Sequence, residues 1–164
     1  MDTMTKLLAI EEIKQLKARY FRFVDTFDRD GWLSLFTENA KLAFDLAVSY
    51  GTSEKPQTYK VEGKKGIAEF WAAGTSRYHT VHHGHMPEIE IISDTEARGV
   101  WAMEDIVETP GDILHGYGHY WETYRKIDGT WLIETLRLTR TRVTQSYKAR
   151  QAPLTSRRTW ATYA

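Results

Sequence analysis

The feature that most limits the possible folds is a run of four long β segments in the second half of the chain. These segments are expected at residues 78–92, 96–109, 114–127 and 131–147. The connections between them carry turn-forming residues, namely Ser93-Asp94, Pro110-Gly111-Asp112 and Asp128-Gly129. Consecutive strands joined by tight turns pair antiparallel, and strands of this length coil strongly. The pattern therefore predicts one strongly curved antiparallel sheet.

The first half of the chain is expected to supply helices that cover this sheet. From Ile10 to Phe27, apolar residues recur at steps of three and four, as on one face of a helix, and charged residues such as Lys17 fall mostly off that stripe. Asp30 can cap a short second helix. A strand is expected over 40–50, and a third helix after Gly66. Helices packed on a curved sheet make an α+β architecture.

Composition sets the class of protein. The 164 residues suit one domain, expected at 1–150, followed by a polar tail at 151–164 whose Trp160 and Tyr163 indicate docking on the domain or on a neighbouring subunit. The 22 Lys and Arg residues balance 22 Asp and Glu residues, so no nucleic-acid partner is expected. No apolar run approaches the about 18 residues of a membrane span, so a cytoplasmic protein is expected. Cysteine is absent, which excludes disulfides and thiolate chemistry.

Two charged residues fall in apolar rows of the expected sheet. Asp105 shares a strand face with Trp101 and Met103, and Arg140 shares one with Leu138 on the last strand. A buried charge needs a partner of opposite charge. The pattern fits a structural ion pair, two charges that reach solvent at strand ends, or two groups of a functional site.

A histidine-rich segment begins the second half of the chain. It holds four of the six histidines: His79, His82, His83 and His85. One of them can serve as a base near neutral pH. Alternatively, His83 and His85 could bind a metal together with His115 and His119, although no Asp or Glu completes the ligand set and no metal is expected. In the third interpretation the histidines lie on a solvent-exposed strand and have no functional role.

The end of the first helix carries two further polar candidates. Tyr20 lies on the apolar stripe, so its hydroxyl needs a partner or faces a cavity. Asp25 follows an apolar run. Without further partners, Tyr20 could be an ordinary core residue and Asp25 an exposed charge.

Five blocks of sequence resemble, in the same order, those of SnoaL-like proteins of the nuclear-transport-factor-2-like (NTF2-like) superfamily. The blocks are 13–25, 32–40, 82–89, 99–105 and 138–140. The resemblance implies a cone-shaped fold, also described as a cystatin-like α+β barrel, with N-terminal helices on a curved antiparallel sheet around an apolar pocket. Dehydratases, a dehydrochlorinase, isomerases and polyketide cyclases belong to this superfamily, as do non-catalytic members and the small subunit of ring-hydroxylating dioxygenases.

The motifs are most similar to those of bile-acid 7α-dehydratases. By this resemblance the catalytic set is Tyr20, Asp25, His82, Asp105 and Arg140. His82 would take a proton, Asp25 would orient it, and Tyr20 would donate a hydrogen bond to a substrate oxygen. Asp105 would protonate a leaving hydroxyl or act as a second base, and Arg140 would keep Asp105 ionised or anchor the substrate.

Strand alternation conflicts with the choice of His82. It places His85, and not His82, on the same face as Ile89. A bulge at Gly84 or Pro87 would reverse this assignment. His82 is therefore the predicted base, with His85 in reserve.

The expected ligand is a small hydrophobic, cyclic molecule. The predicted pocket walls are Trp71, His85, Trp101, Met103, Tyr117 and Trp121. No cofactor is expected. The predicted activity is that of a dehydratase-type lyase or an isomerase or cyclase, with a non-catalytic binding protein or a structural dioxygenase subunit as alternatives. The resemblance further implies a homo-oligomer, either a dimer or a trimer.

Overall fold

The computed structural model describes residues 2–50, 56–74 and 78–147. It contains α1 (Thr3–Asp25), α2 (Arg29–Ser34), β1 (Phe36–Asp45), β2 (Thr58–Glu62), α3 (Gly63–Ala73), β3 (His79–Ile91), β4 (Glu96–Glu108), β5 (Asp112–Ile127) and β6 (Thr130–Tyr147). The predicted helices and the four long strands are therefore confirmed. The predicted docking of Trp160 and Tyr163 lies outside the described residues.

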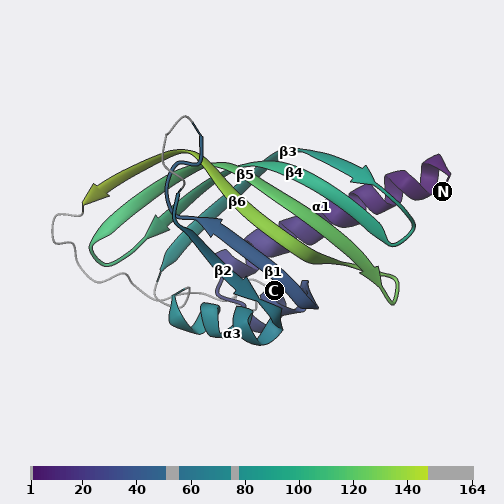
Figure 1. Cartoon of the computed structure of the whole chain (residues 1–164), viewed down its shortest axis with the longest axis horizontal. Coiled ribbons are helices and arrows are strands. Elements are labelled where there is room, and N and C mark those ends of the chain that lie inside the picture. Colours follow the sequence, from purple (N-terminus) through teal and green to yellow (C-terminus); the bar gives the residue numbers. More distant parts are fainter. Residues whose placement is uncertain (1, 51–55, 75–77, 148–164) are drawn as a thin grey trace.

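The six strands form one curved sheet in the order β2-β1-β6-β5-β4-β3 (Figure 1). The meander from β3 to β6 is antiparallel, as predicted. One pairing outside this meander is parallel: β1 pairs with β6, with Leu42 opposite Leu136. This pairing joins segments that are far apart in the chain, so no turn-forming residues between them predict it. The sheet does not close into a barrel, since β2 and β3 remain its edges.

The helices pack on the inner face of this sheet. α1 crosses behind the strands and α3 lies beside β1 and β2 (Figure 1). The stripe of α1 predicted to be apolar is buried, including Ile13, Leu16 and Tyr20. Asp28, rather than the predicted Asp30, caps α2 by accepting a hydrogen bond from the Gly31 N–H (2.8 Å), because the helix begins at Arg29. None of the described helices is long and apolar enough to cross a membrane.

A bulge in β3 decides which histidine faces inward. The pairing of β3 with β4 shifts between His85 and Glu88, and Met86 takes a positive φ of 28° there. Before the bulge, His82 pairs directly with Asp105, and after it Ile89 pairs with Gly99. One extra residue in a strand reverses the alternation of its side chains. Both His82 and Ile89 can therefore belong to the inner face, which strict alternation forbids.

Candidate active site

A cavity of about 450 Å³ lies between the inner face of the sheet, α1 and α3. Four of the five predicted catalytic residues line it: Tyr20, His82, Asp105 and Arg140. The remaining wall is largely apolar and includes Val24, Trp32, Phe44, Phe70, Leu114 and Leu138. The cavity thus combines a few polar groups with an apolar surround, which is the usual composition of a small-molecule site.

The fifth predicted residue, Asp25, stands behind His82. Its Oδ1 lies 2.7 Å from His82 Nδ1, and its Oδ2 accepts a hydrogen bond from the His82 backbone N–H at 2.9 Å. The Thr80 hydroxyl also donates to Oδ1, at 2.9 Å. A carboxylate at this position assigns the proton of neutral His82 to Nδ1, so Nε2 keeps its lone pair. The ring of Phe21 stacks on that of His82, with centroids 6.2 Å apart.

Asp105 and Arg140 form a buried, bidentate ion pair. Arg140 Nη1 and Nη2 donate to the two carboxylate oxygens at 2.9 and 2.8 Å. Arg140 Nε donates to the backbone oxygen of Asp45 at 3.2 Å. Burial opposes the charge of Arg140, but the hydrogen bond and charge of Asp105 raise its pKa above the ordinary value. The cavity wall therefore carries a fixed and internally compensated pair of charges.

Two buried tyrosines add hydroxyl groups to the wall of the cavity. Tyr20 belongs to α1 and Tyr120 to β5, and both line the cavity. Burial, together with nearby carboxylates, raises the pKa of Tyr20 well above its usual value, and burial likewise raises that of Tyr120. Both hydroxyls therefore keep their protons and can donate hydrogen bonds. Reasoning from the sequence missed Tyr120, although alternation along β5 places its side chain on the opposite face of the strand from that of Trp121.

The six residues predicted as pocket walls lie elsewhere, which corrects that prediction. Trp71, Trp101 and Met103 are buried in the hydrophobic core. His85 and Trp121 are exposed and Tyr117 is half-buried. Tyr117 and Trp121 alternate along β5 with the inward-facing Tyr120, so their side chains point to the outer face.

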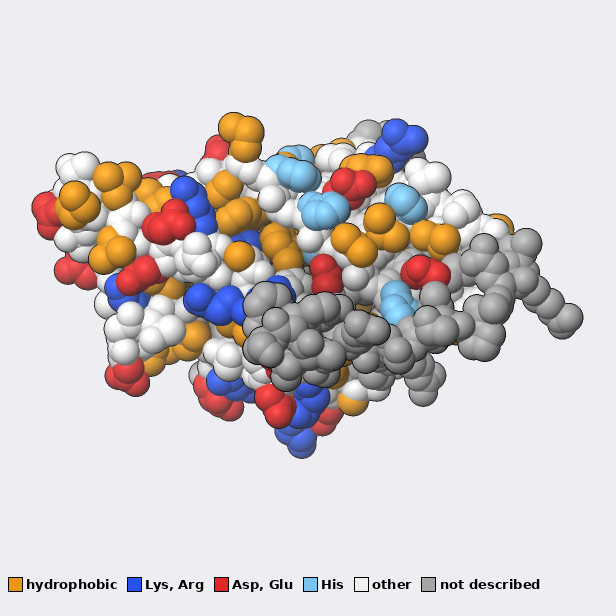
Figure 2. All heavy atoms as spheres, turned by 180° about the vertical axis from the view of Figure 1, so that it is seen from behind, with side chains coloured by type: hydrophobic (Ala, Val, Ile, Leu, Met, Phe, Trp, Pro, Cys, Tyr) orange, Lys and Arg blue, Asp and Glu red, His pale blue; other side chains and the backbone are white. Residues whose placement is uncertain are grey.

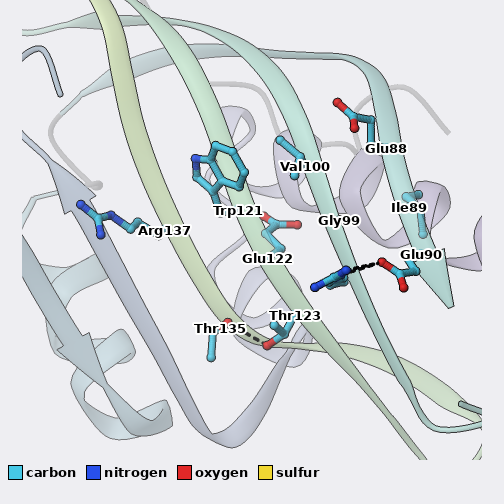
Figure 3. Close-up of a pocket in the computed structure, with 11 residues that line it drawn as sticks. Glu88, Ile89, Glu90, Gly99, Val100, Trp121, Glu122, Thr123, Thr135 and Arg137 are labelled. Carbon is cyan, nitrogen blue, oxygen red and sulfur yellow. Dashed lines mark hydrogen bonds and ion pairs between the residues drawn. The ribbon is translucent and has the colours of Figure 1, made fainter. Parts of the chain in front are cut away.

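A second hollow, of about 680 Å³, lies along the outer face of the sheet. Trp121 stands in it on the face turned away from α1 (Figure 3). Arg137 lies beside Trp121 on the neighbouring strand (Figure 3). Arg98 also lines this hollow and forms an ion pair with Glu90 (2.6 Å). None of the five predicted catalytic residues lines this groove.

The sequence did not predict a buried ion pair between Lys17 and Glu122, which lies beside the rings of Tyr20 and Tyr120. Lys17 Nζ lies 2.5 Å from Glu122 Oε1, with both side chains fully buried. The same ammonium lies 3.5 Å from the ring centroid of Tyr120. Burial lowers the pKa of Lys17 to about 8, a shift that Glu122 partly offsets. Lys17 falls off the apolar stripe of α1 and is nevertheless buried, because the sheet wraps around more of α1 than that stripe indicates.

Histidine and apolar side chains gather on one face of the molecule (Figure 2). His83 and His85 are exposed on β3, and His83 Nδ1 lies 3.8 Å from Glu104. Across residues 2–50, 56–74 and 78–147, no three His, Asp or Glu side chains are placed to hold a metal ion. The grouping of His83 and His85 with His115 and His119 thus finds no ligand cluster among these residues.

A curved six-stranded sheet, covered by N-terminal helices around a cavity with a His–Asp pair, defines an NTF2-like α+β protein. The profile of the SnoaL-like domain matches residues 5–137. The chain therefore belongs to the SnoaL-like family.

Known proteins agree with this assignment. "Probable cyclase FGR4" of Gibberella zeae (strain PH-1) is 27% identical over 133 residues, which cover 78% of this chain and 88% of that protein. A provisionally named scytalone dehydratase from Novosphingobium aromaticivorans superposes with a TM-score of 0.74 at 21% identity, over 93% of this chain and 97% of that one. A hexachlorocyclohexane dehydrochlorinase (LinA type 3) from Novosphingobium barchaimii gives 0.71 at 16% identity, over 93% and 100%. The two structures, at these identities, establish a common fold.

Proposed function

We propose that the protein is a cofactor-independent acid–base enzyme that acts on a small hydrophobic, cyclic molecule, as a dehydratase-type lyase or as an isomerase or cyclase. The observation that carries the proposal is the oriented His82–Asp25 pair on the wall of an apolar cavity. On the neighbouring strand, Asp105 pairs directly with His82. A histidine with one nitrogen fixed by a carboxylate and the other free is equipped to move a proton.

In the proposed mechanism, His82 Nε2 removes a proton from a carbon next to a carbonyl group. Asp25 stabilises the imidazolium that forms, because it accepts the hydrogen bond from Nδ1. Tyr20 and Tyr120 line the cavity with neutral hydroxyls, which can stabilise the negative charge that develops on the carbonyl oxygen.

The same proton can complete a dehydration. The enolate expels a hydroxide from the neighbouring carbon, and the imidazolium returns its proton to this leaving group as water. Because Arg140 holds Asp105 through two hydrogen bonds, we assign Asp105 to the acceptor of a substrate hydroxyl rather than to an acid. Without a leaving group, return of the proton to another carbon gives an isomerisation. The named activities of the relatives, a cyclase, a dehydratase and a dehydrochlorinase, support this range of reactions.

Two alternatives make different predictions. A non-catalytic binding protein would keep the cavity and bind a ligand without turnover. A structural dioxygenase subunit would form a stable complex with an iron-containing partner and have no activity alone. Neither role requires a histidine oriented by a carboxylate inside the cavity, which is why the enzyme is preferred. The predicted dimer or trimer belongs to the same proposal and can be tested by sedimentation.

The test is incorporation of deuterium from D₂O into cyclic ketones, enones and β-hydroxyketones, measured by mass spectrometry. Wild type, His82→Ala and the control His83→Ala are compared, because His83 is the exposed neighbour of His82. Exchange should fall about 100-fold or more in His82→Ala and stay unchanged in His83→Ala. Exchange that survives in His82→Ala would refute the assigned base. A wild type that binds these compounds without exchange would favour the binding protein.

A further inference from the structure

The Asp105–Arg140 pair spans a strand that lies between its two members. Asp105 belongs to β4 and Arg140 to β6, and β5 separates them in the sheet. Neighbouring strands lie roughly 4.8 Å apart, so β4 and β6 are about 9.6 Å apart. The two side chains must therefore meet above β5. The residue of β5 that pairs directly with Asp105 is Gly116.

Gly116 leaves the space in which the two side chains meet. A Cβ atom at this position would lie 1.8 Å from Arg140 Nη1 and 2.1 Å from Asp105 Oδ1. Both distances are far shorter than a non-bonded contact permits. The φ angle of Gly116 is not in the left-handed region, so its backbone conformation is open to any residue. Glycine is therefore required here for space and not for backbone freedom.

Other contacts restrict how Arg140 can move away from such a side chain. Ser49 Oγ accepts a hydrogen bond from the Arg140 backbone N–H at 2.8 Å, and the Ser49 N–H donates to the Arg140 carbonyl oxygen at 2.6 Å. The backbone oxygen of Asp45 accepts from Arg140 Nε. These bonds fix the arginine on the side of β1. The bonds with Ser49 hold the backbone, and the bond from Nε to Asp45 holds the side chain, so a displaced guanidinium would have to break the bond to Asp45 or enter the cavity.

We propose that Gly116 is a positioning residue that seats the Asp105–Arg140 pair at the cavity wall. This inference rests on the proposed function, in which the pair holds the substrate. A side chain at position 116 would separate the two charges or push them toward the substrate. Displacement of a positioned group by about 1 Å can reduce a rate about 100-fold.

The test compares Gly116→Ala with Gly111→Ala, because a Cβ at Gly111 meets no atom within 4 Å. With the best compound from the deuterium-exchange panel, kcat should fall at least about tenfold in Gly116→Ala and stay unchanged in Gly111→Ala. A wild-type kcat in Gly116→Ala would refute the proposal. Loss confined to KM would also contradict it, since a mispositioned pair should slow the reaction itself.

A thermodynamic cycle tests the positioning role of Gly116 without any substrate. Gly116→Ala is made in wild type and in the Asp105→Ala/Arg140→Ala background, and the thermal midpoints are compared. A clash with the pair predicts a large loss in wild type and almost none in the background that lacks the pair. A variant that folds only in that background would give the same answer. Equal losses of thermal midpoint in the two backgrounds would refute the positioning role of Gly116. Unequal losses, together with a wild type that shows no activity, would refute only the proposed function.

Discussion

Replacing Lys17 by methionine, which can neither carry the charge nor donate the hydrogen bond to Glu122, should destabilise the fold severely. Lys17 and Glu122 form an ion pair whose side chains are both fully buried, with 2.5 Å between Nζ and Oε1. Lys17→Met leaves the carboxylate of Glu122 buried without its cation. Loss of one member of such a pair costs about 3–5 kcal/mol, and methionine replaces most of the lost packing. We expect the free energy of unfolding to decrease by this amount.

Removing the second charge should restore most of the stability. Glu122 Oε2 accepts a hydrogen bond from the Tyr124 hydroxyl, and the Tyr124 oxygen accepts one from Trp101 Nε1 at 2.8 Å. Glutamine keeps an oxygen for Tyr124 and carries no charge. The Lys17→Met/Glu122→Gln variant should therefore unfold within about 1.5 kcal/mol of wild type.

The assay is urea denaturation followed by circular dichroism, with Lys14→Met as the control on the same helix. Lys14 forms an ion pair with Glu11 whose side chains are about half exposed, so its loss should cost less than about 1 kcal/mol. Two results would refute the reasoning. One is a loss in Lys17→Met as small as that in Lys14→Met, and the other is a double variant as unstable as Lys17→Met.

Four further predictions follow from the site. Asp25→Asn should reduce deuterium exchange at least about 100-fold. The backbone N–H and Nδ1 of His82 contact two different oxygens of Asp25, and asparagine has only one such oxygen. Unchanged exchange would contradict this prediction. Burial lowers the pKa of Lys17 from 10.5 to about 8, so the unfolded chain binds more protons than the folded chain between these pH values. The stability of the wild type relative to the double variant should therefore rise from pH 8 to 10.5 in urea titrations, since a neutral amine, unlike methionine, still donates to Glu122. Trp121→Ala should leave exchange unchanged, because Trp121 lies outside the cavity. Tyr120→Phe should slow exchange without a fall in the thermal midpoint comparable to that of Lys17→Met; equal exchange would remove Tyr120 from the site.

Much of the fold could be predicted because its signals are local. The long strands of the meander follow from apolar and β-branched runs between turn residues such as Asp128 and Gly129. The three helices follow from apolar periodicity. The parallel pairing of β1 with β6 could not be predicted in this way, because its partners are far apart in the chain and no connection fixes their register.

The candidate site was predicted only in part, for a related reason. The resemblance placed His82 and Asp25 in one set, and the structure brings their side chains within hydrogen-bond distance. The predicted walls were wrong for two reasons. Trp121 and Tyr117 point to the outer face of the sheet, and Trp71, Trp101 and Met103 are buried in the hydrophobic core. A strand pattern shows which residues share a face, but not which face is covered.

The sequence alone determined the class of fold, the succession of its elements and the residue types available for acid–base chemistry. The tertiary structure decided which of these residues meet. A single bulge after His85 turned His82 inward, and the curvature of the sheet enclosed Lys17 with Glu122. The lack of a side chain at Gly116 lets Asp105 reach Arg140. Each of these outcomes depends on the distance and direction between strands, which arise only when separate segments of the chain pack together.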